Sequence, residues 1–154
     1  MTKVLMTFFV VVCTTVSLIA QTDMLWDHHG VGFTVPDNFV IEVNNADEFS
    51  ANNDNLYLSI FPIQDADITA DDLADAVLDM AKSLKYDRIE EGDEVDIDDF
   101  NGYFIKGKKD GANAVFMALL DKHSSTNLIV MVVYTDRYED EAVDIAASLY
   151  AYDK

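Results

Sequence analysis

The first hydrophobic feature of the chain is an uninterrupted apolar run from Val4 to Ile19. A lone Lys3 precedes it, and the small Ala20 and polar Gln21 follow it. A basic start, an apolar centre and a small residue before a polar segment are typical of a secretory signal peptide. We therefore predict that residues 1–20 are a signal peptide cleaved between Ala20 and Gln21, and that the mature chain is periplasmic or extracellular.

Two other interpretations of this segment remain open. A membrane anchor needs about 17 to 25 apolar residues, and the run from Val4 to Ile19 is shorter than that. A lipid anchor would require Cys13 to follow a small residue, but Val12 precedes it. A cleaved signal fits better than either, so we expect no stable membrane insertion after processing.

Past a short N-terminal lead at residues 21–30, apolar and polar positions alternate over 31–35 and again over 39–43. This period of two predicts two strands, and the turn residues Pro36, Asp37 and Asn38 between them favour a hairpin. Residues 44–55 are rich in Asn, Asp and Ser and are expected to form a long loop.

Five further alternating or apolar segments predict strands at 56–61, 93–98, 103–108, 114–120 and 128–134. Asn101-Gly102 and Asp110-Gly111 are expected to be hairpin turns. The last two segments are apolar at nearly every position, which is typical of strands buried on both faces.

Two segments carry a helical period. Thr69 and Asp72 resemble a capped helix start, and apolar residues then recur at helical spacing to about Tyr86. Asp136, followed three residues later by Glu139, is expected to cap a final helix.

The predicted order is therefore βββαββββα, an α+β fold with a mostly antiparallel sheet flanked by two helices in an α/β/α sandwich. Residues 31–154 are expected to form a single domain. If both helices lay on one face, the other face would be bare, and an apolar face of that size would itself be a partner site.

Charge narrows the range of partners. Residues 1–20 hold one lysine and no acid, so their removal changes the net charge from -19 to -20. Such a chain repels nucleic acid and anionic membranes, and it attracts cations or basic partners. Cys13 is the only cysteine, so the mature domain would have no disulfide, no thiol nucleophile and no Cys-ligated zinc.

Three features suggest ligand chemistry without deciding it. His28 and His29 are adjacent and would point to opposite sides of an extended segment, so joint metal binding, even with His123, is less favoured than a solvated or packing role. The acidic run Asp93, Glu94, Asp96, Asp98, Asp99 and Asn101 lacks the ligand spacing of an EF-hand. A weak cation site there, or ligand binding by the 44–55 loop, remains an alternative function.

Motifs for catalysis are absent from the sequence: it has no G-x-S-x-G, no H-E-x-x-H and no Gly-rich phosphate loop. We assign no catalytic, cofactor or metal residue, and a secreted hydrolase is a remote alternative.

The chain resembles the PsbP-like and DcrB-like proteins of extracytoplasmic compartments. The residues that carry the resemblance are GFTVPDNF at 32–39, Asn101-Gly102-Tyr103, and Ala147-Ser148-Leu149 in the closing helix. The resemblance implies a sheet between two helices, no shared catalytic residues and binding of another protein. Together with the export signal, it leads us to expect an exported, non-catalytic accessory protein.

Overall fold

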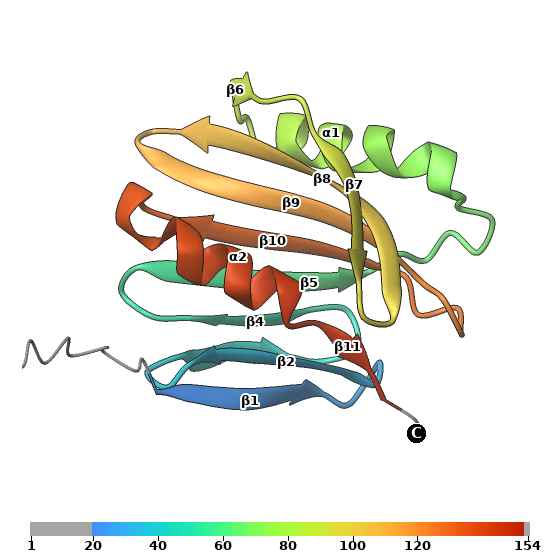
Figure 1. The fold of residues 1–154 in the computed structure, drawn as a ribbon, viewed down its shortest axis with the longest axis horizontal. Coiled ribbons are helices and arrows are strands. Elements are labelled where there is room, and N and C mark those ends of the chain that lie inside the picture. The colour runs from blue at the N-terminus through green and yellow to red at the C-terminus, as the bar shows by residue number, and fades with distance from the viewer. Residues whose placement is uncertain (1–19, 153–154) are drawn as a thin grey trace, which may run out of the picture.

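The computed structural model describes residues 20–152, so all of the predicted signal peptide 1–20 except Ala20 lies outside the described residues. Two antiparallel sheets and two helices make up the fold, with one helix on each side of the larger sheet (Figure 1). The predicted class, an α+β fold with a mostly antiparallel sheet and two flanking helices, is confirmed.

The larger sheet has eight strands. Its order is β3 (Val40–Asn44), β4 (Phe49–Asn52), β5 (Leu56–Pro62), β10 (Leu128–Tyr134), β9 (Ala112–Asp121), β8 (Phe100–Lys109) and β6 (Arg88–Ile89). The eighth strand, β7 (Asp93–Ile97), also pairs with β8. Strand β7 crosses in front of this sheet and borders its front face on one side (Figure 1).

The smaller sheet has the order β1 (Gln21–Trp26), β2 (Val31–Pro36) and β11 (Tyr150–Ala151). The hairpin predicted between residues 31–35 and 39–43 is therefore wrong, because β2 pairs with β1 and β11 while β3 pairs with β4. The chain crosses from one sheet to the other at Asp37 and Asn38. Residues 21–30, which were predicted to be an N-terminal lead, form strand β1 and the turn after it. Trp26 at the end of β1 is fully buried.

The predicted loop at 44–55 contains a strand that its polar composition concealed. Phe49 and Ala51 of β4 are fully buried in the core. The asparagines on either side make turns. The Asn45 side chain accepts the backbone N–H groups of Asp47 and Glu48, and the Asn53 side chain accepts those of Asn55 and Leu56. These side chains stabilise the turns that join short strands.

Of the two predicted turns, Asp110-Gly111 is confirmed, with φ angles of 51° and 80°. Asn101-Gly102 is not a turn, since both residues lie inside β8, and the hairpin turns at Asp98-Asp99 instead. Gly102 lets β8 approach β9 closely, because a Cβ at this position would lie 2.2 Å from the Ala118 carbonyl oxygen.

Helix α1 (Leu73–Ser83) follows a short 3-10 turn in which the Asp72 carboxylate accepts the Thr69 N–H, as the predicted cap implies. It ends earlier than Tyr86 because Lys85 adopts a left-handed φ of 64°. Helix α2 (Glu139–Ala147) also follows a 3-10 turn. Thr135, and not Asp136 as predicted, occupies the N-cap position of this turn, and it makes no side-chain capping hydrogen bond.

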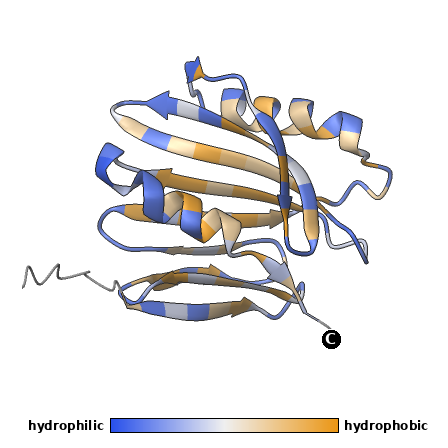
Figure 2. Ribbon diagram, in the orientation of Figure 1, coloured by the Kyte–Doolittle hydropathy of each residue, from blue (hydrophilic) through white to orange (hydrophobic). Residues whose placement is uncertain are grey.

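Two hydrophobic clusters lie on opposite faces of the larger sheet, and β9 belongs to both. Val115, Met117 and Leu119 pack with α2 and β2, while the alternate residues Ala114, Phe116 and Ala118 pack with α1. Strands β9 and β10 are accordingly hydrophobic over most of their length, whereas helix α2 carries both hydrophobic and hydrophilic residues (Figure 2). The prediction of burial on both faces is confirmed for 114–119.

No helix within residues 20–152 is long and apolar enough to cross a bilayer.

If residues 21–30 belong to the core, Trp26→Ala will lower the free energy of unfolding by about 3 to 5 kcal/mol, because it leaves a large cavity. Chemical denaturation followed by circular dichroism measures this change. The matched control is the neighbouring Leu25, which is 47% exposed, and Leu25→Ala should shift stability by about 0.5 kcal/mol or less. Equal effects of the two substitutions would contradict the assignment of β1 to the core.

Candidate binding sites on the two sheet faces

The two helices cover opposite halves of the larger sheet. Helix α1 contacts β8 and β9 on the rear face, whereas α2 contacts β10 of this sheet and β2 of the smaller one on the front face (Figure 1). Each face therefore keeps one half without a helix over it, and these two halves are the candidate sites.

On the front face, the uncovered half is an apolar groove of about 290 Å³ between α2 and β7. Strands β8 and β9 form its floor, β7 forms one wall and α2 the other. The apolar lining residues are Val95, Ile97, Phe104, Val115, Met117, Val143, Ala146 and Ala147. The only polar residue that lines this groove is Lys106.

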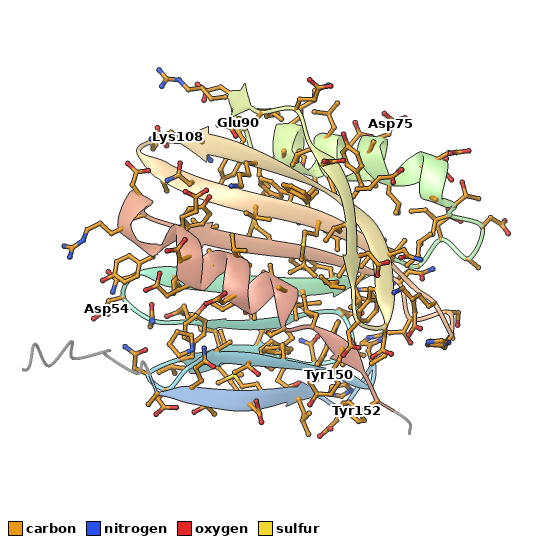
Figure 3. The ribbon with its side chains drawn as sticks, viewed as in Figure 1. Asp54, Asp75, Glu90, Lys108, Tyr150 and Tyr152 are labelled. Atoms are coloured by element: carbon orange, nitrogen blue, oxygen red, sulfur yellow. The ribbon has the colours of Figure 1, made fainter. Side chains whose placement is uncertain are left out.

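A polar cleft of about 400 Å³ adjoins the groove and is lined by charged residues from β6, β8 and the start of α2. Lys106 lines both cavities. Its Nζ lies 2.6 Å from Glu139 Oε1, and Lys108 Nζ lies 3.6 Å from Asp136 Oδ1. The Asn113 side-chain amide donates to the same Asp136 oxygen at 2.5 Å. Figure 3 labels Lys108 and Glu90 at this end of the molecule.

Three ionisable groups of the cleft have shifted pKa values. The hydrogen bond to Glu139 raises the pKa of Lys106. The hydrogen bond from Asn113, aided by Lys108, lowers the pKa of Asp136. Burial raises the pKa of Tyr134. All three pKa values move away from neutrality, which suits binding by charged Lys106 and Asp136 and a neutral Tyr134 more than proton transfer by these groups.

On the rear face, the uncovered half spans β3, β5 and β10. Tyr57 and Phe61 of β5 lie opposite Val133 and Ile129 of β10 in the strand register, and Met131 lies between the latter two. All five side chains are half-buried. Val40 of β3, on the row of Tyr57, is 65% exposed. We call Val40, Tyr57, Phe61, Ile129, Met131 and Val133 the β5–β10 face.

This face contradicts one part of the sequence prediction. Residues 128–134 were expected to be covered on both sides, like 114–120. Only the side of Leu128, Val130, Val132 and Tyr134 is buried. The physical reason is that α1 lies mainly over β8 and β9, so Ile129, Met131 and Val133 of β10 only border its hydrophobic cluster and stay half-buried.

The histidines are placed separately. The His29 ring nitrogen lies 2.6 Å from the Ala46 carbonyl oxygen, and the ring packs against Trp26 with centroids 4.2 Å apart. His123 lies in the loop after β9, where its backbone N–H donates to Asp121. Within residues 20–152, no three His, Cys, Asp or Glu side chains come together in a way that could hold a metal ion.

The acidic run at 93–101 contributes its oxygens singly to local structure. Lys122 Nζ lies 2.5 Å from Asp96 Oδ1 and also donates to the Asp98 carbonyl. Asp99 accepts the backbone N–H of Ala151, which ties β11 to the β7–β8 turn. These contacts direct the carboxylates to different partners and not to a shared cation.

The predicted processing residues flank the start of the described fold. Gln21 is the first residue of β1, and the Ala20 carbonyl accepts the Asp37 N–H at 3.1 Å. Cleavage between them stays a prediction.

Neither candidate site was found from the sequence. One signal was available: along β8, Phe104, Lys106 and Lys108 change from apolar to charged on a single face. Their neighbours on β7 and α2 come from distant segments, so only the folded chain shows that they share a cavity.

No protein-family model and no curated protein sequence matches the chain. Solved structures do match. Cyanobacterial PsbP (CyanoP) from Synechocystis sp. PCC 6803 aligns with a TM-score of 0.61 at 15% identity, over 93% of this chain and 99% of that one. The chain has a PsbP-like fold.

Two further structures share this PsbP-like fold. The Saccharomyces cerevisiae Ran-binding protein Mog1p has a TM-score of 0.55 at 12% identity, over 88% of this chain and 97% of its own. Mycobacterium tuberculosis LpqN, involved in cell envelope biogenesis, has a TM-score of 0.50 at 13% identity, over 87% and 91%. At such identities the likeness concerns the fold alone.

Asn113→Ala is expected to raise the pKa of Asp136 towards its usual value of 3.8, because the hydrogen bond from Asn113 is the main cause of the lowered pKa. NMR titration of the Asp136 carboxyl measures this. Ionised Asp136 stabilises the fold above its usual pKa, and that contribution is lost as the pH falls through the lowered one. Lys108→Met should raise the pKa of Asp136 less than Asn113→Ala does. An unchanged pKa in Asn113→Ala would show that the hydrogen bond from Asn113 does not lower the pKa of Asp136.

Proposed function

We propose that this chain is an exported, non-catalytic accessory protein that binds a protein partner through the β5–β10 face. The observation that carries the proposal is an apolar sheet face left without a covering helix. Contiguous exposed apolar patches in soluble proteins commonly mark interaction sites. Aromatic residues and methionine are enriched in protein interfaces, and this face presents Tyr57, Phe61 and Met131.

The shape of the site also supports a macromolecular partner. Five of the six side chains of the β5–β10 face come from the adjacent strands β5 and β10 in register, and Val40 extends this broad surface across β4 to β3. Small ligands usually occupy concave pockets, whereas protein partners cover broad patches of surface. The net charge of -19 favours a partner whose contacting rim is basic, and association should then slow as salt is added.

A role without catalysis is supported by the state of the polar cleft, whose shifted groups are held in their neutral-pH forms. Among the proteins of similar fold, Mog1p is a Ran-binding protein and LpqN is involved in cell envelope biogenesis. A shared fold does not carry over a partner, but it supports protein binding as a use of this architecture.

The alternative of cation or ligand binding by the acidic strand or the 44–55 loop is less well supported. Asp96 and Asp99 are engaged in separate contacts, and the 44–55 segment contains strand β4 with its turns.

Phe61→Asp is expected to abolish capture of the partner, because it places a charge within an apolar interface, opposite Ile129. The purified chain, tagged at its C-terminus, would be used to capture proteins from the envelope fraction of the source organism, with recovered proteins quantified by mass spectrometry. We expect one protein to be recovered at least tenfold less with Phe61→Asp than with the unaltered chain.

The matched control for that experiment is Leu25→Asp, which puts the same charge at an exposed apolar residue of the smaller sheet. It should recover the partner normally. Circular dichroism would establish that both variants are folded. Equal recovery with Phe61→Asp and the unaltered chain would reject the β5–β10 face as the site.

Export predicts a defined mature terminus. Secreted protein expressed with its own leader should have the mass of residues 21–154, and Ala20→Arg should leave the precursor uncleaved, because the cleavage site requires a small residue. Intact-mass spectrometry measures both. A secreted chain of full length, or cleavage at another bond, would contradict the proposed processing.

A further inference from the structure

The front face changes from apolar to polar in passing from the groove to the cleft. Three rows of side chains across the strands show this change. The first row is Phe104, Met117 and Val130, the second is Lys106, Val115 and Val132, and the third is Lys108, Asn113 and Tyr134. Successive rows are two residues apart, or about 7 Å. The floor thus passes from fully apolar to fully polar over about 13 Å.

Helix α2 repeats this gradient in the wall above the floor. Glu139, its first residue, lies at the polar cleft, while Val143 and Ala147 line the apolar groove. At 1.5 Å per residue, these side chains are spaced about 6 Å apart along the helix. Wall and floor therefore change from charged to apolar over nearly the same length.

The apolar part suits an aliphatic chain better than a peptide. Its floor is the face of a paired sheet, whose backbone groups are already used between strands, and its lining has no polar side chain except Lys106. A peptide backbone laid in it would lose water without gaining hydrogen-bond partners. A hydrocarbon chain carries no such groups.

The polar part specifies the other end of the ligand. Its charged lining residues are balanced in sign: Arg88, Lys106 and Lys108 against Glu90, Asp136 and Glu139. A purely anionic head would meet three carboxylates within a chain of net charge -19, and a purely cationic head would meet three basic groups. A head with both charges pairs with both sets.

The existing ion pairs do not block such a head. In the Lys106 to Glu139 pair, the side chains are 33% and 50% exposed, and in the Lys108 to Asp136 pair they are 38% and 76% exposed. Exposed ion pairs of this kind contribute little to stability, so a ligand head can replace them at little cost in free energy.

We propose that the groove and the cleft together bind a zwitterionic amphiphile with a single aliphatic chain, of the lysophospholipid type. The chain lies over Phe104 and Met117 beside Val143, and the head lies in the cleft beyond Lys106. This site is on the opposite face from the β5–β10 face and does not rest on the proposed protein partner.

Calorimetric titration of the purified chain with dodecylphosphocholine, below its critical micelle concentration, tests the proposal. We expect saturable binding at one site. Dodecyl maltoside, dodecanoate and dodecyltrimethylammonium carry the same tail with a neutral, an anionic and a cationic head, and each should bind at least tenfold more weakly.

Two pairs of variants assign the ends of the ligand. Val143→Asp should weaken binding of dodecylphosphocholine at least tenfold, whereas Leu25→Asp, an equally exposed apolar position elsewhere, should leave it within twofold. Lys106→Met should weaken binding at least fivefold. Lys109→Met removes the same charge from the same strand outside both cavities and should have no effect.

Phe61→Asp should leave amphiphile binding unchanged, so this proposal and the protein-binding proposal can fail separately. Absence of saturable binding, equally tight binding of dodecanoate, or unchanged binding by a folded Val143→Asp variant would each overturn the assignment.

Discussion

Burial of β9 on both of its faces is the constraint on which the rest of this structure depends. Val115, Met117 and Leu119 lie in the hydrophobic cluster of α2, and the alternate residues Ala114, Phe116 and Ala118 lie in that of α1. Successive side chains of β9 therefore face the two helices in turn. A strand of this kind must lie inside a sheet and must be covered on both sides. It therefore places the helices on opposite faces and joins the two clusters into one fold.

The size of the helices then explains why both faces stay partly open. Helix α1 has eleven residues and α2 has nine. A helix is about 10 Å wide, and adjacent strands are about 4.8 Å apart, so one helix covers roughly two strands. The sheet is wider than that, and each face keeps an uncovered half. On the front, β7 bends over the sheet and turns the open half into a groove. On the rear, no strand does so, and the face stays broad.

The shapes of the two open faces favour different kinds of ligand. A groove with apolar walls and a charge-balanced end has the dimensions and chemistry of a small amphiphile site, whereas a broad face with aromatic side chains suits a protein. The acidic residues that stood out in the sequence serve local structure: Asp96 pairs with Lys122, and Asp99 holds β11. Residue types that are frequent in metal sites thus carry little information until their partners are known.

The α+β class, both helices, most strands and the two-sided burial of residues 114–119 could be predicted from the sequence, because these features follow from the period of apolar side chains along a short segment. The prediction missed β1 and β4, where polar residues interrupt the pattern, and it paired residues 31–35 with the wrong strand. Strand pairing, and the reach of each helix over the sheet, depend on contacts between distant segments. The folded chain shows that Phe104, Lys106 and Val143 share a cavity and that one side of β10 is only half-buried. These features could not be predicted, because a local pattern says which side chains avoid water but not what covers them.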